Sequence, residues 1–253
     1  MTPDRVHETL RRHLLVDGFD LVLDTHASRG SWLVDARDGA RHLDLFSFFA
    51  SAPLGMNHPA LADDPDFVTE LVEVAVNKPS NSDIYTTYLA EFVEPFTRVV
   101  GDPALPHLFF VEGGALAVEN ALKTAFDWKR RHNEMHGRGD RGTKVLHLRK
   151  AFHGRSGYTL SLTNTDPVKT VLFPKFDWPR IDVPAIHFPI EVGAVVEAEQ
   201  RALAQAANAF AEHPHDIACF IAEPIQGEGG DKHMRAEFLH AMQELCHAND
   251  ALF

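Results

Sequence analysis

The stretch from Leu108 to Lys123 constrains the fold of this chain more than any other, and it reads Leu-Phe-Phe-Val-Glu-Gly-Gly-Ala-Leu-Ala-Val-Glu-Asn-Ala-Leu-Lys. Its four apolar residues at 108–111 predict a buried strand, the two glycines predict a sharp turn, and the residues from 115 onward predict a helix. The first turn of a helix has unpaired N–H groups and the positive end of the helix dipole, and glycine lets a ligand approach the backbone closely. The stretch therefore predicts an anion site.

The spacing of these glycines limits the kind of anion. The pattern is neither Gly-x-Gly-x-x-Gly nor a P-loop, so a smaller phosphorylated cofactor is expected in place of a dinucleotide or a nucleoside triphosphate. An ordinary glycine-rich loop between a strand and a helix is the alternative, and this stretch alone favours that alternative.

Composition excludes several other classes of function. A chain of 253 residues with 45% hydrophobic content can bury a substantial core, and a formal charge of −12 argues against a general nucleic-acid binder. Cys219 and Cys246 lack metal-ligand spacing and predict reduced, buried thiols in a cytoplasmic protein. His132 and His136 lack the companion ligands that a metal site needs. No apolar run is long enough to span a bilayer, so no membrane partner is expected.

The first hundred residues predict a small lobe followed by helices. Residues 3–16 have helical spacing, 19–23 alternate like a strand, and 31–35 with 41–46 flank Asp38-Gly39, which predicts a hairpin. A loop rich in proline and glycine at 51–59 predicts a boundary, with residues 1–55 forming a segment of the small lobe and 56–253 the N-terminal part of a larger domain. Helices are expected at 65–76 and 86–100.

From residue 108 onward, strands alternate with helices. Strands are predicted at 108–111, 144–148, 158–163 and 217–221, and helices at 115–132, 191–211 and 235–247. This order predicts an α/β fold with a mostly parallel sheet covered by helices on both faces. Residues 251–253 begin another apolar strand that is too short to be whole. We therefore expect the chain to be a fragment, truncated before the end of its large domain.

Two loops at the ends of predicted strands carry chemically useful side chains. Residues 151–157 read Ala-Phe-His-Gly-Arg-Ser-Gly, and residues 222–230 read Ala-Glu-Pro-Ile-Gln-Gly-Glu-Gly-Gly. An open α/β sheet binds its ligands at such ends. An aromatic ring can stack on a planar cofactor, an arginine can hold a carboxylate through two hydrogen bonds, and two carboxylates can do acid–base work. Taken singly, each of these residues is more commonly structural.

In this order and spacing, the three loops resemble those of class III pyridoxal-phosphate aminotransferases, which share the PLP-transferase fold type I. The resemblance runs from the hairpin at Asp38-Gly39 to the last residue, and the most specific parts are Phe-His-Gly-Arg at 152–155 and Glu-Pro-Ile-Gln-Gly-Glu at 223–228. Within the family, residues 152–159 and 173–180 look most like the members that pass the ε-amino group of L-lysine to 2-oxoglutarate. Acetylornithine, ornithine or 4-aminobutyrate is the alternative amino donor.

The resemblance implies a role for each matching residue. The backbone of Gly114 and Ala115 would hold the phosphate of pyridoxal 5'-phosphate, and Phe152 would stack on its ring. The cofactor-binding residues implied by the match also include His153 and Glu223, while the substrate-binding residues are Arg155, for the α-carboxylate, and Glu228, a gate that pairs with an arginine from the C-terminal half. Gly113 stands where many members carry a serine or threonine, so one hydroxyl contact to the phosphate is missing.

The family's Schiff-base lysine, and the aspartate that pairs with the pyridinium nitrogen, would both lie beyond Phe253. The chain as given is therefore expected to contain no catalytic lysine and to be inactive alone. A non-catalytic cofactor-binding fragment is a second hypothesis. A third is a fragment that pairs with an intact subunit, because family members are homodimers, and residues 81–85 resemble part of that contact surface.

Overall fold

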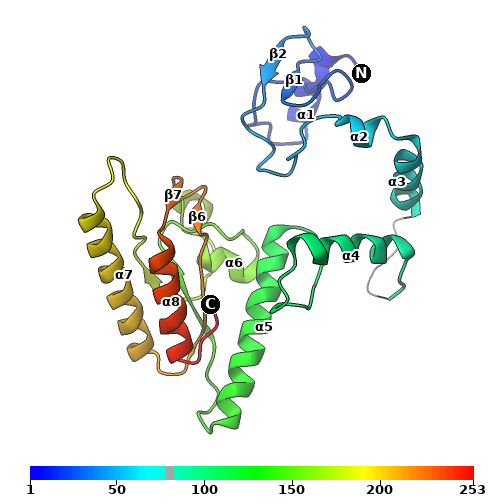
Figure 1. Cartoon of the computed structure of the whole chain (residues 1–253). Coiled ribbons are helices and arrows are strands. Elements are labelled where there is room, and N and C mark those ends of the chain that lie inside the picture. Colours follow the sequence, from blue (N-terminus) through cyan, green and yellow to red (C-terminus); the bar gives the residue numbers. More distant parts are fainter. Residues whose placement is uncertain (78–82) are drawn as a thin grey trace. The chain divides into compact units, whose positions relative to one another are not determined.

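The computed structural model describes residues 1–77 and 83–253, and its contacts divide the chain into two compact units, residues 1–106 and 107–253 (Figure 1). This division falls later than residue 55. The boundary predicted there concerns the lobes of the complete fold and stays a prediction. Residues 81 and 82 of the predicted subunit contact lie outside the described part of the chain.

The first unit contains the predicted hairpin. Strands β1 (Trp32–Val34) and β2 (Arg41–Leu43) pair antiparallel, and Gly39 in the connecting turn adopts a φ of +77°, which glycine reaches without strain. A short 3-10 turn at Pro3–Arg5 leads into α1 (Val6–Arg11), which ends earlier than residue 16. The helices that follow are α2 (Pro59–Ala62), α3 (Pro65–Asn77) and α4 (Thr87–Val100), so the two helices predicted here are confirmed.

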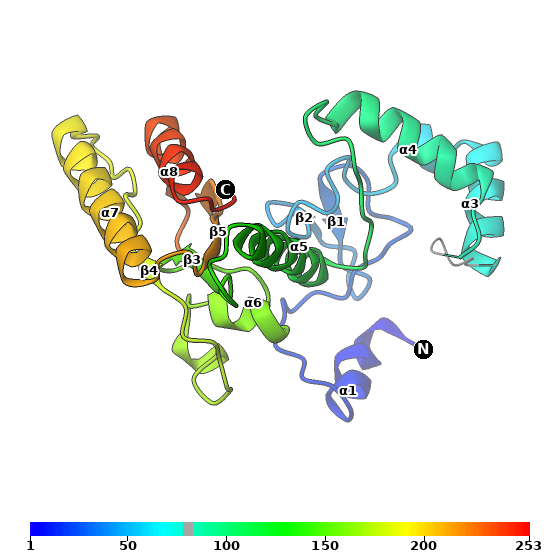
Figure 2. The same ribbon diagram turned by 90° about the horizontal axis from the view of Figure 1, so that it is seen from below.

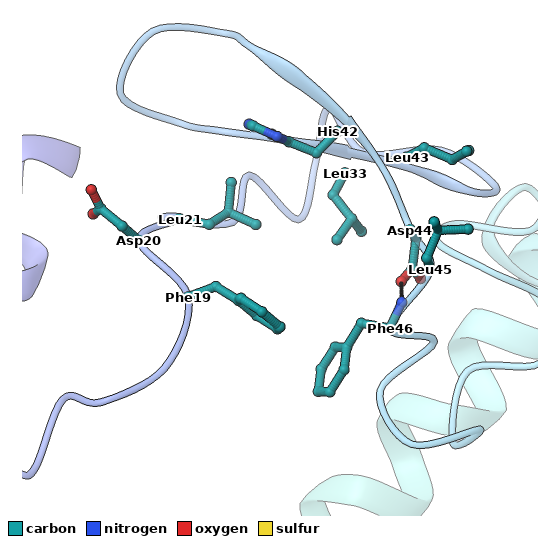
Figure 3. Close-up of a pocket in the computed structure, with 9 residues that line it drawn as sticks. All are labelled: Phe19, Asp20, Leu21, Leu33, His42, Leu43, Asp44, Leu45 and Phe46. Atoms are coloured by element: carbon teal, nitrogen blue, oxygen red, sulfur yellow. Dashed lines mark hydrogen bonds between the residues drawn. The ribbon is translucent and has the colours of Figure 1, made fainter. Parts of the chain in front are cut away.

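The strand predicted at residues 19–23 is wrong. Within this segment only Leu23 pairs with another residue, in an isolated bridge with Asp35. The backbone N–H of Leu21 donates to the carbonyl oxygen of Phe19, which closes a tight turn in place of a strand. This turn lines an apolar hollow of about 580 Å³, in which the rings of Phe19 and Phe46 meet edge to face at 5.3 Å (Figure 3). On the opposite side of this hollow, the Asp44 carboxylate accepts a hydrogen bond from Phe46 N–H at 3.0 Å and so fixes the wall that carries Phe46.

The second unit is built on a three-stranded parallel sheet in the order β4-β3-β5. Its strands are β3 (Lys144–Leu148), β4 (Arg180–Ile181) and β5 (Ile217–Ile221). Helices α7 (Val192–Glu212) and α8 (Ala236–Ala248) cover one face, and α5 (Gly114–Met135) and α6 (Gly157–Leu162) cover the other (Figure 2). Leu252 adds a parallel bridge to Cys219, so the predicted start of another strand after α8 is confirmed.

Alternation along β3 divides the core into two layers. Leu146 and Leu148 belong to the layer beneath α7 and α8, whereas Val145 packs with Leu122 and Ala125 of α5. Alanines at 202, 206 and 209 let α7 lie close to the sheet. Both cysteines are free and buried as predicted, and burial raises the pKa of each thiol to about 12.

Two further strand predictions are wrong. Residues 108–111 form no ladder with any described strand, and Phe109 is 74% exposed, because an apolar run becomes a strand only where a partner edge is available. Residues 158–163 lie largely in α6. The Thr159 hydroxyl accepts a hydrogen bond from Ser156 N–H at 3.0 Å, which satisfies an N–H donor at the start of this helix. This hydrogen bond favours the helix over the predicted strand. The hairpin of β6 (Ile225–Gln226) and β7 (Lys232–His233) was not predicted.

No helix in the described part of the chain is long and apolar enough to cross a membrane.

Replacing Lys129 with alanine should lower the free energy of unfolding by about 2–4 kcal/mol. This lysine of α5 is fully buried, and its ammonium donates to the carbonyl oxygens of Asn249 and Asp250 beyond α8. The variant loses that packing and leaves both acceptors without their donor. Urea unfolding followed by circular dichroism measures the change. Lys123→Ala, on the exposed side of the same helix, is the control, and equal small effects of both variants would contradict the assignment.

Candidate active site

Three segments of the second unit meet at the carboxyl end of its parallel sheet. One is the start of α5, the second is the loop 149–156 that follows β3, and the third is the loop 222–231 that follows β5. Gly113 precedes α5 with a φ of +88°, and no side chain caps that end of the helix. The side of the sheet predicted to bind ligands is therefore also the side on which these glycine-rich segments gather.

The loop after β3 is pressed against the start of α5 at Gly154. A Cβ atom on Gly154 would lie 2.6 Å from the Cβ of Ala115, and the φ of this glycine is +116°. Glycine is thus required at this position for two reasons, its positive φ and the close approach of Ala115. This contact brings the neighbours of Gly154, which are His153 and Arg155, to the first turn of α5.

Glu119 fastens the same loop one turn further along α5. Its carboxylate accepts hydrogen bonds from the Ser156 hydroxyl at 2.7 Å and from Thr159 N–H at 3.2 Å. These bonds tie the start of α6 to α5. The loop after β3 is therefore held to α5 at two residues, Gly154 and Ser156.

Glu223 joins the loop after β5 to the loop after β3. Its carboxylate accepts Phe152 N–H at 2.8 Å and Gly227 N–H at 3.3 Å. Burial raises the pKa of this carboxyl, the two hydrogen bonds oppose that rise, and nearby Glu228 adds to it. Glu223 thus positions the backbone that carries the half-buried ring of Phe152.

The second crosslink between these loops involves Gln226 and Gly229. The Gln226 amide donates to Arg149 O at 2.9 Å, and a Cβ on Gly229 would lie 2.1 Å from Lys150 O. The two loops are consequently in backbone contact, which leaves little freedom in the position of Phe152 relative to Glu228.

His153 is the buried histidine of the loop after β3. Its backbone N–H donates to the Thr163 hydroxyl at 3.0 Å, and that hydroxyl donates to the backbone oxygen of Gly154 at 2.6 Å. Its Nε2 has no hydrogen-bond partner among the described residues. Burial lowers the pKa of His153 to about 4, so the imidazole is neutral at pH 7.

Glu228 lies at the outer end of the site. Its carboxylate accepts a bond from the Lys169 ammonium and another from the Thr165 hydroxyl, both at 2.6 Å. Burial by itself raises the pKa of this carboxyl, but the two bonds and the charges of Lys169 and Arg155 together lower it below its ordinary value. Glu228 is therefore ionised at neutral pH.

The residues present fit a phosphorylated aromatic cofactor. Apart from chain neighbours and the backbone of α5 itself, added Cβ atoms on Gly113 and Gly114 would meet no atom within 4 Å, so the first turn of α5 is open to a ligand. Its N–H groups supply donors for an anion. Phe152 presents its half-buried ring, and Arg155 is exposed.

The structure thus places all seven sequence-predicted residues on three adjoining segments. Direct contacts join Ala115 to Gly154 and Phe152 to Glu223, and the charge of Arg155 acts on Glu228. Their roles in binding remain predictions. Sequence reasoning missed Glu119, Thr165 and Lys169. Only Glu119 has a local signal, because it follows Ala115 by one helical turn and so shares its face.

Comparisons with known proteins show which family the chain matches. A family model described as "Aminotransferase class-III" matches residues 17–253. The L-lysine-epsilon aminotransferase of Mycobacterium bovis is 66% identical over 252 residues, which are 99% of this chain and 56% of that relative. The enzyme of the same name from Amycolatopsis lactamdurans is 63% identical over 250 residues, covering 98% of this chain and 56% of the relative.

A solved structure also matches this chain in three dimensions. The lysine aminotransferase from M. tuberculosis in the internal aldimine form has a TM-score of 0.97 and 65% sequence identity, and the match covers 100% of this chain and 58% of that one. The fold type I architecture predicted from the sequence is thereby confirmed. The chain spans a little over half the length of the relatives it matches.

Gly154→Ala should lower the free energy of unfolding by about 2–4 kcal/mol, because the new methyl group overlaps Ala115 and alanine disfavours a positive φ. Urea unfolding measures the loss. Gly157→Ala is the matched control, since its Cβ would meet only Glu119 Oε1 at an ordinary 3.7 Å. A Gly154 variant as stable as this control would show that the loop does not rest on α5.

The neutral state of His153 should make the protein less stable in acid. Its folded pKa of about 4 lies below the unfolded value of 6.5, so the unfolded chain binds more protons between these values, and stability falls as pH drops through that window. The contribution reaches about 3 kcal/mol. Unfolding free energies at pH 7 and pH 4.5 should differ less in His153→Gln than in the wild type. Exposed His240→Gln should leave the difference unchanged, and an unaltered difference in His153→Gln would refute the assignment.

Proposed function

Because this chain belongs to the class-III aminotransferases, a pyridoxal-phosphate-dependent family, we propose that it is the N-terminal part of an enzyme that moves the ε-amino group of L-lysine to 2-oxoglutarate. The observation that carries the proposal is the contact of Gly154 with Ala115, because it sets Phe152 and Arg155 beside the helix start that would hold the phosphate. The names of the relatives support lysine as the amino donor.

In this proposal the start of α5 binds the cofactor's phosphate. The N–H groups of Gly114 and Ala115 donate to it, and the helix dipole favours its negative charge. Gly113 contributes no hydroxyl, so backbone groups do the binding. Phe152 then covers the planar ring, and its backbone is fixed by Glu223.

When bound, pyridoxal 5'-phosphate supplies an electron sink for reactions at the carbon that bears the amino group. The chain's own residues orient the substrate toward it. Arg155 holds the α-carboxylate of lysine through parallel hydrogen bonds, which directs the distant ε-amine to the cofactor. The ionised Glu228 supplies the negative charge that balances a cation when the substrate lacks a second carboxylate. His153, neutral and buried, follows Phe152 directly in the same loop.

The Schiff-base lysine is proposed to lie outside these 253 residues. Two lysines near the loops have other partners: Lys169 binds Glu228, and Lys150 donates to Thr165 O at 3.3 Å. On this proposal the chain by itself binds cofactor without turnover, and the longer protein is a cytoplasmic homodimer. Acetylornithine, ornithine or 4-aminobutyrate as the better donor would change the substrate but leave the rest of the proposal intact.

Pyridoxal 5'-phosphate should bind the chain with an affinity that inorganic phosphate reduces by competition and that Phe152→Ala reduces about tenfold. Fluorescence titration measures the dissociation constant. Phe173→Ala, which removes an exposed ring from the same unit, should bind like the wild type. Equal affinity in the Phe152 and Phe173 variants would remove the support for the site.

Borohydride reduction of the loaded chain should attach the cofactor to no single lysine, because none of the lysines present matches the family's Schiff-base position. Peptide mass spectrometry after reduction measures the attachment. A homogeneous modification of one lysine, together with a half-reaction with L-lysine, would contradict the proposed inactivity of the chain alone. It would leave the aminotransferase assignment standing.

A further inference from the structure

Lys150 adopts a backbone conformation that its residue type disfavours. It is the second residue after β3, and its φ of +61° lies in the left-handed region that residues other than glycine rarely occupy. Such a conformation persists only where the surrounding structure fixes it. Phe152 follows two residues later, so the turn at Lys150 decides where the proposed ring-binding side chain lies.

Asn164, in the segment after α6, supplies the contacts that fix this turn. Its Oδ1 accepts the backbone N–H of Lys150 at 2.6 Å. Its Nδ2 donates to the carbonyl oxygens of Leu148 at 3.2 Å and Leu162 at 2.7 Å. Its own backbone N–H donates to the carbonyl oxygen of Ala151 at 2.9 Å. Asn164 therefore bonds the chain before, at and after the left-handed residue.

The carboxamide of asparagine matches the groups that it meets. The carbonyl of Leu148 and the N–H of Lys150 flank Arg149, and a residue of a neighbouring parallel strand would bond the same two groups. An amide side chain has both the acceptor and the donors for them, whereas aspartate has no N–H and alanine has neither. Asn164 thus supplies, at the point where β3 ends, the hydrogen bonds that a further strand would supply.

Lys150 also contacts the loop after β5. A Cβ atom on Gly229 would overlap the carbonyl oxygen of Lys150, so the two backbones touch at this point. The preceding carbonyl, that of Arg149, accepts the hydrogen bond from the Gln226 amide. The turn that Asn164 holds is consequently where the segment after α6 and the loops after β3 and β5 meet.

We propose that Asn164 is a positioning residue, which holds Lys150 in the left-handed conformation and thereby sets the place of Phe152 relative to the start of α5. Its hold on the loop depends only on contacts within this chain. Its consequence for binding rests on the proposed function, in which Phe152 covers the ring of pyridoxal 5'-phosphate.

Amide hydrogen exchange followed by NMR tests the hold on the loop without any ligand. The N–H groups of Phe152 and His153 report on the loop, because they donate to Glu223 and Thr163 and not to Asn164. In Asn164→Ala their exchange should become about tenfold faster relative to the amides of β3. Residues that matter only for overall stability would change the exchange of loop and strand alike.

Replacing Lys150 with glycine separates this role from a general loss of stability. Glycine reaches a positive φ without strain, so the loop keeps its course there without Asn164. Asn164→Ala should therefore accelerate exchange about twofold at most in Lys150→Gly, but about tenfold in Lys150→Ala. The alanine background is the matched control, because it also lacks the bond from Lys150 Nζ to Thr165 O.

Two results would overturn the hold on the loop. One is equal acceleration by Asn164→Ala in the glycine and alanine backgrounds. The other is a loss of folding in Asn164→Ala that Lys150→Gly does not repair. Asn208→Ala, which removes an exposed amide from α7, should leave exchange in the loop unchanged.

Calorimetry then connects the loop to the cofactor. Asn164→Ala should bind pyridoxal 5'-phosphate about tenfold more weakly, as Phe152→Ala does, and should bind inorganic phosphate like the wild type. The hydrogen bonds of Asn164 reach the loop and not the start of α5, so the phosphate contacts stay intact. The double variant with Phe152→Ala should bind the cofactor no more weakly than Phe152→Ala, because both changes act through one ring.

The two measurements distinguish this role from the proposed function. If the exchange results hold but pyridoxal 5'-phosphate does not bind the wild type, the proposed function fails while the hold of Asn164 on the loop stands. If the cofactor binds the wild type and Asn164→Ala equally, or if the variant loses inorganic phosphate as strongly as the cofactor, the positioning role fails.

Discussion

The site depends on the close approach of one loop to the first turn of α5. At Gly154 a backbone with a φ of +116° lies so close to Ala115 that no side chain fits between them. Burial of the surrounding layer, with Leu122 and Ala125 of α5 against Val145 of β3, fixes the helix relative to the sheet. The loop that leaves β3 is consequently aimed at the helix start, and Glu119 secures it there.

Two polar side chains, one half-buried and one buried, then fix the second loop relative to the first. Glu223 and Gln226 reach from the segment after β5 to backbone groups of the segment after β3. Each bond satisfies a group that would be costly to leave unpaired, so these loops have few alternative arrangements. The outer end is less buried, since the ion-paired side chains of Glu228 and Lys169 are partly exposed.

The sequence predicted the parts whose signals are local. The glycine turn before α5, the strands predicted at 144–148 and 217–221, and the helices predicted at 191–211 and 235–247 all depend on neighbours in the chain, and the structure contains each of these elements. The strands predicted at 108–111 and 158–163 failed for two different reasons. The first needs a partner edge that sequence pattern alone does not supply, and the second is overruled by hydrogen bonds to Ser156 and Glu119. Lys169 is brought to Glu228 by tertiary structure across 59 residues, and no local pattern connects them.

The most direct test of the account is to find where the cofactor's phosphate contacts the chain. Pyridoxal 5'-phosphate added to the ¹⁵N-labelled protein should shift the amide resonances of Gly114 and Ala115 most strongly, followed by those of the loop that carries Phe152. Inorganic phosphate should shift the first pair but not the loop. Shifts centred elsewhere, with Gly114 and Ala115 unmoved by either ligand, would contradict the central claim that the start of α5 is the phosphate site.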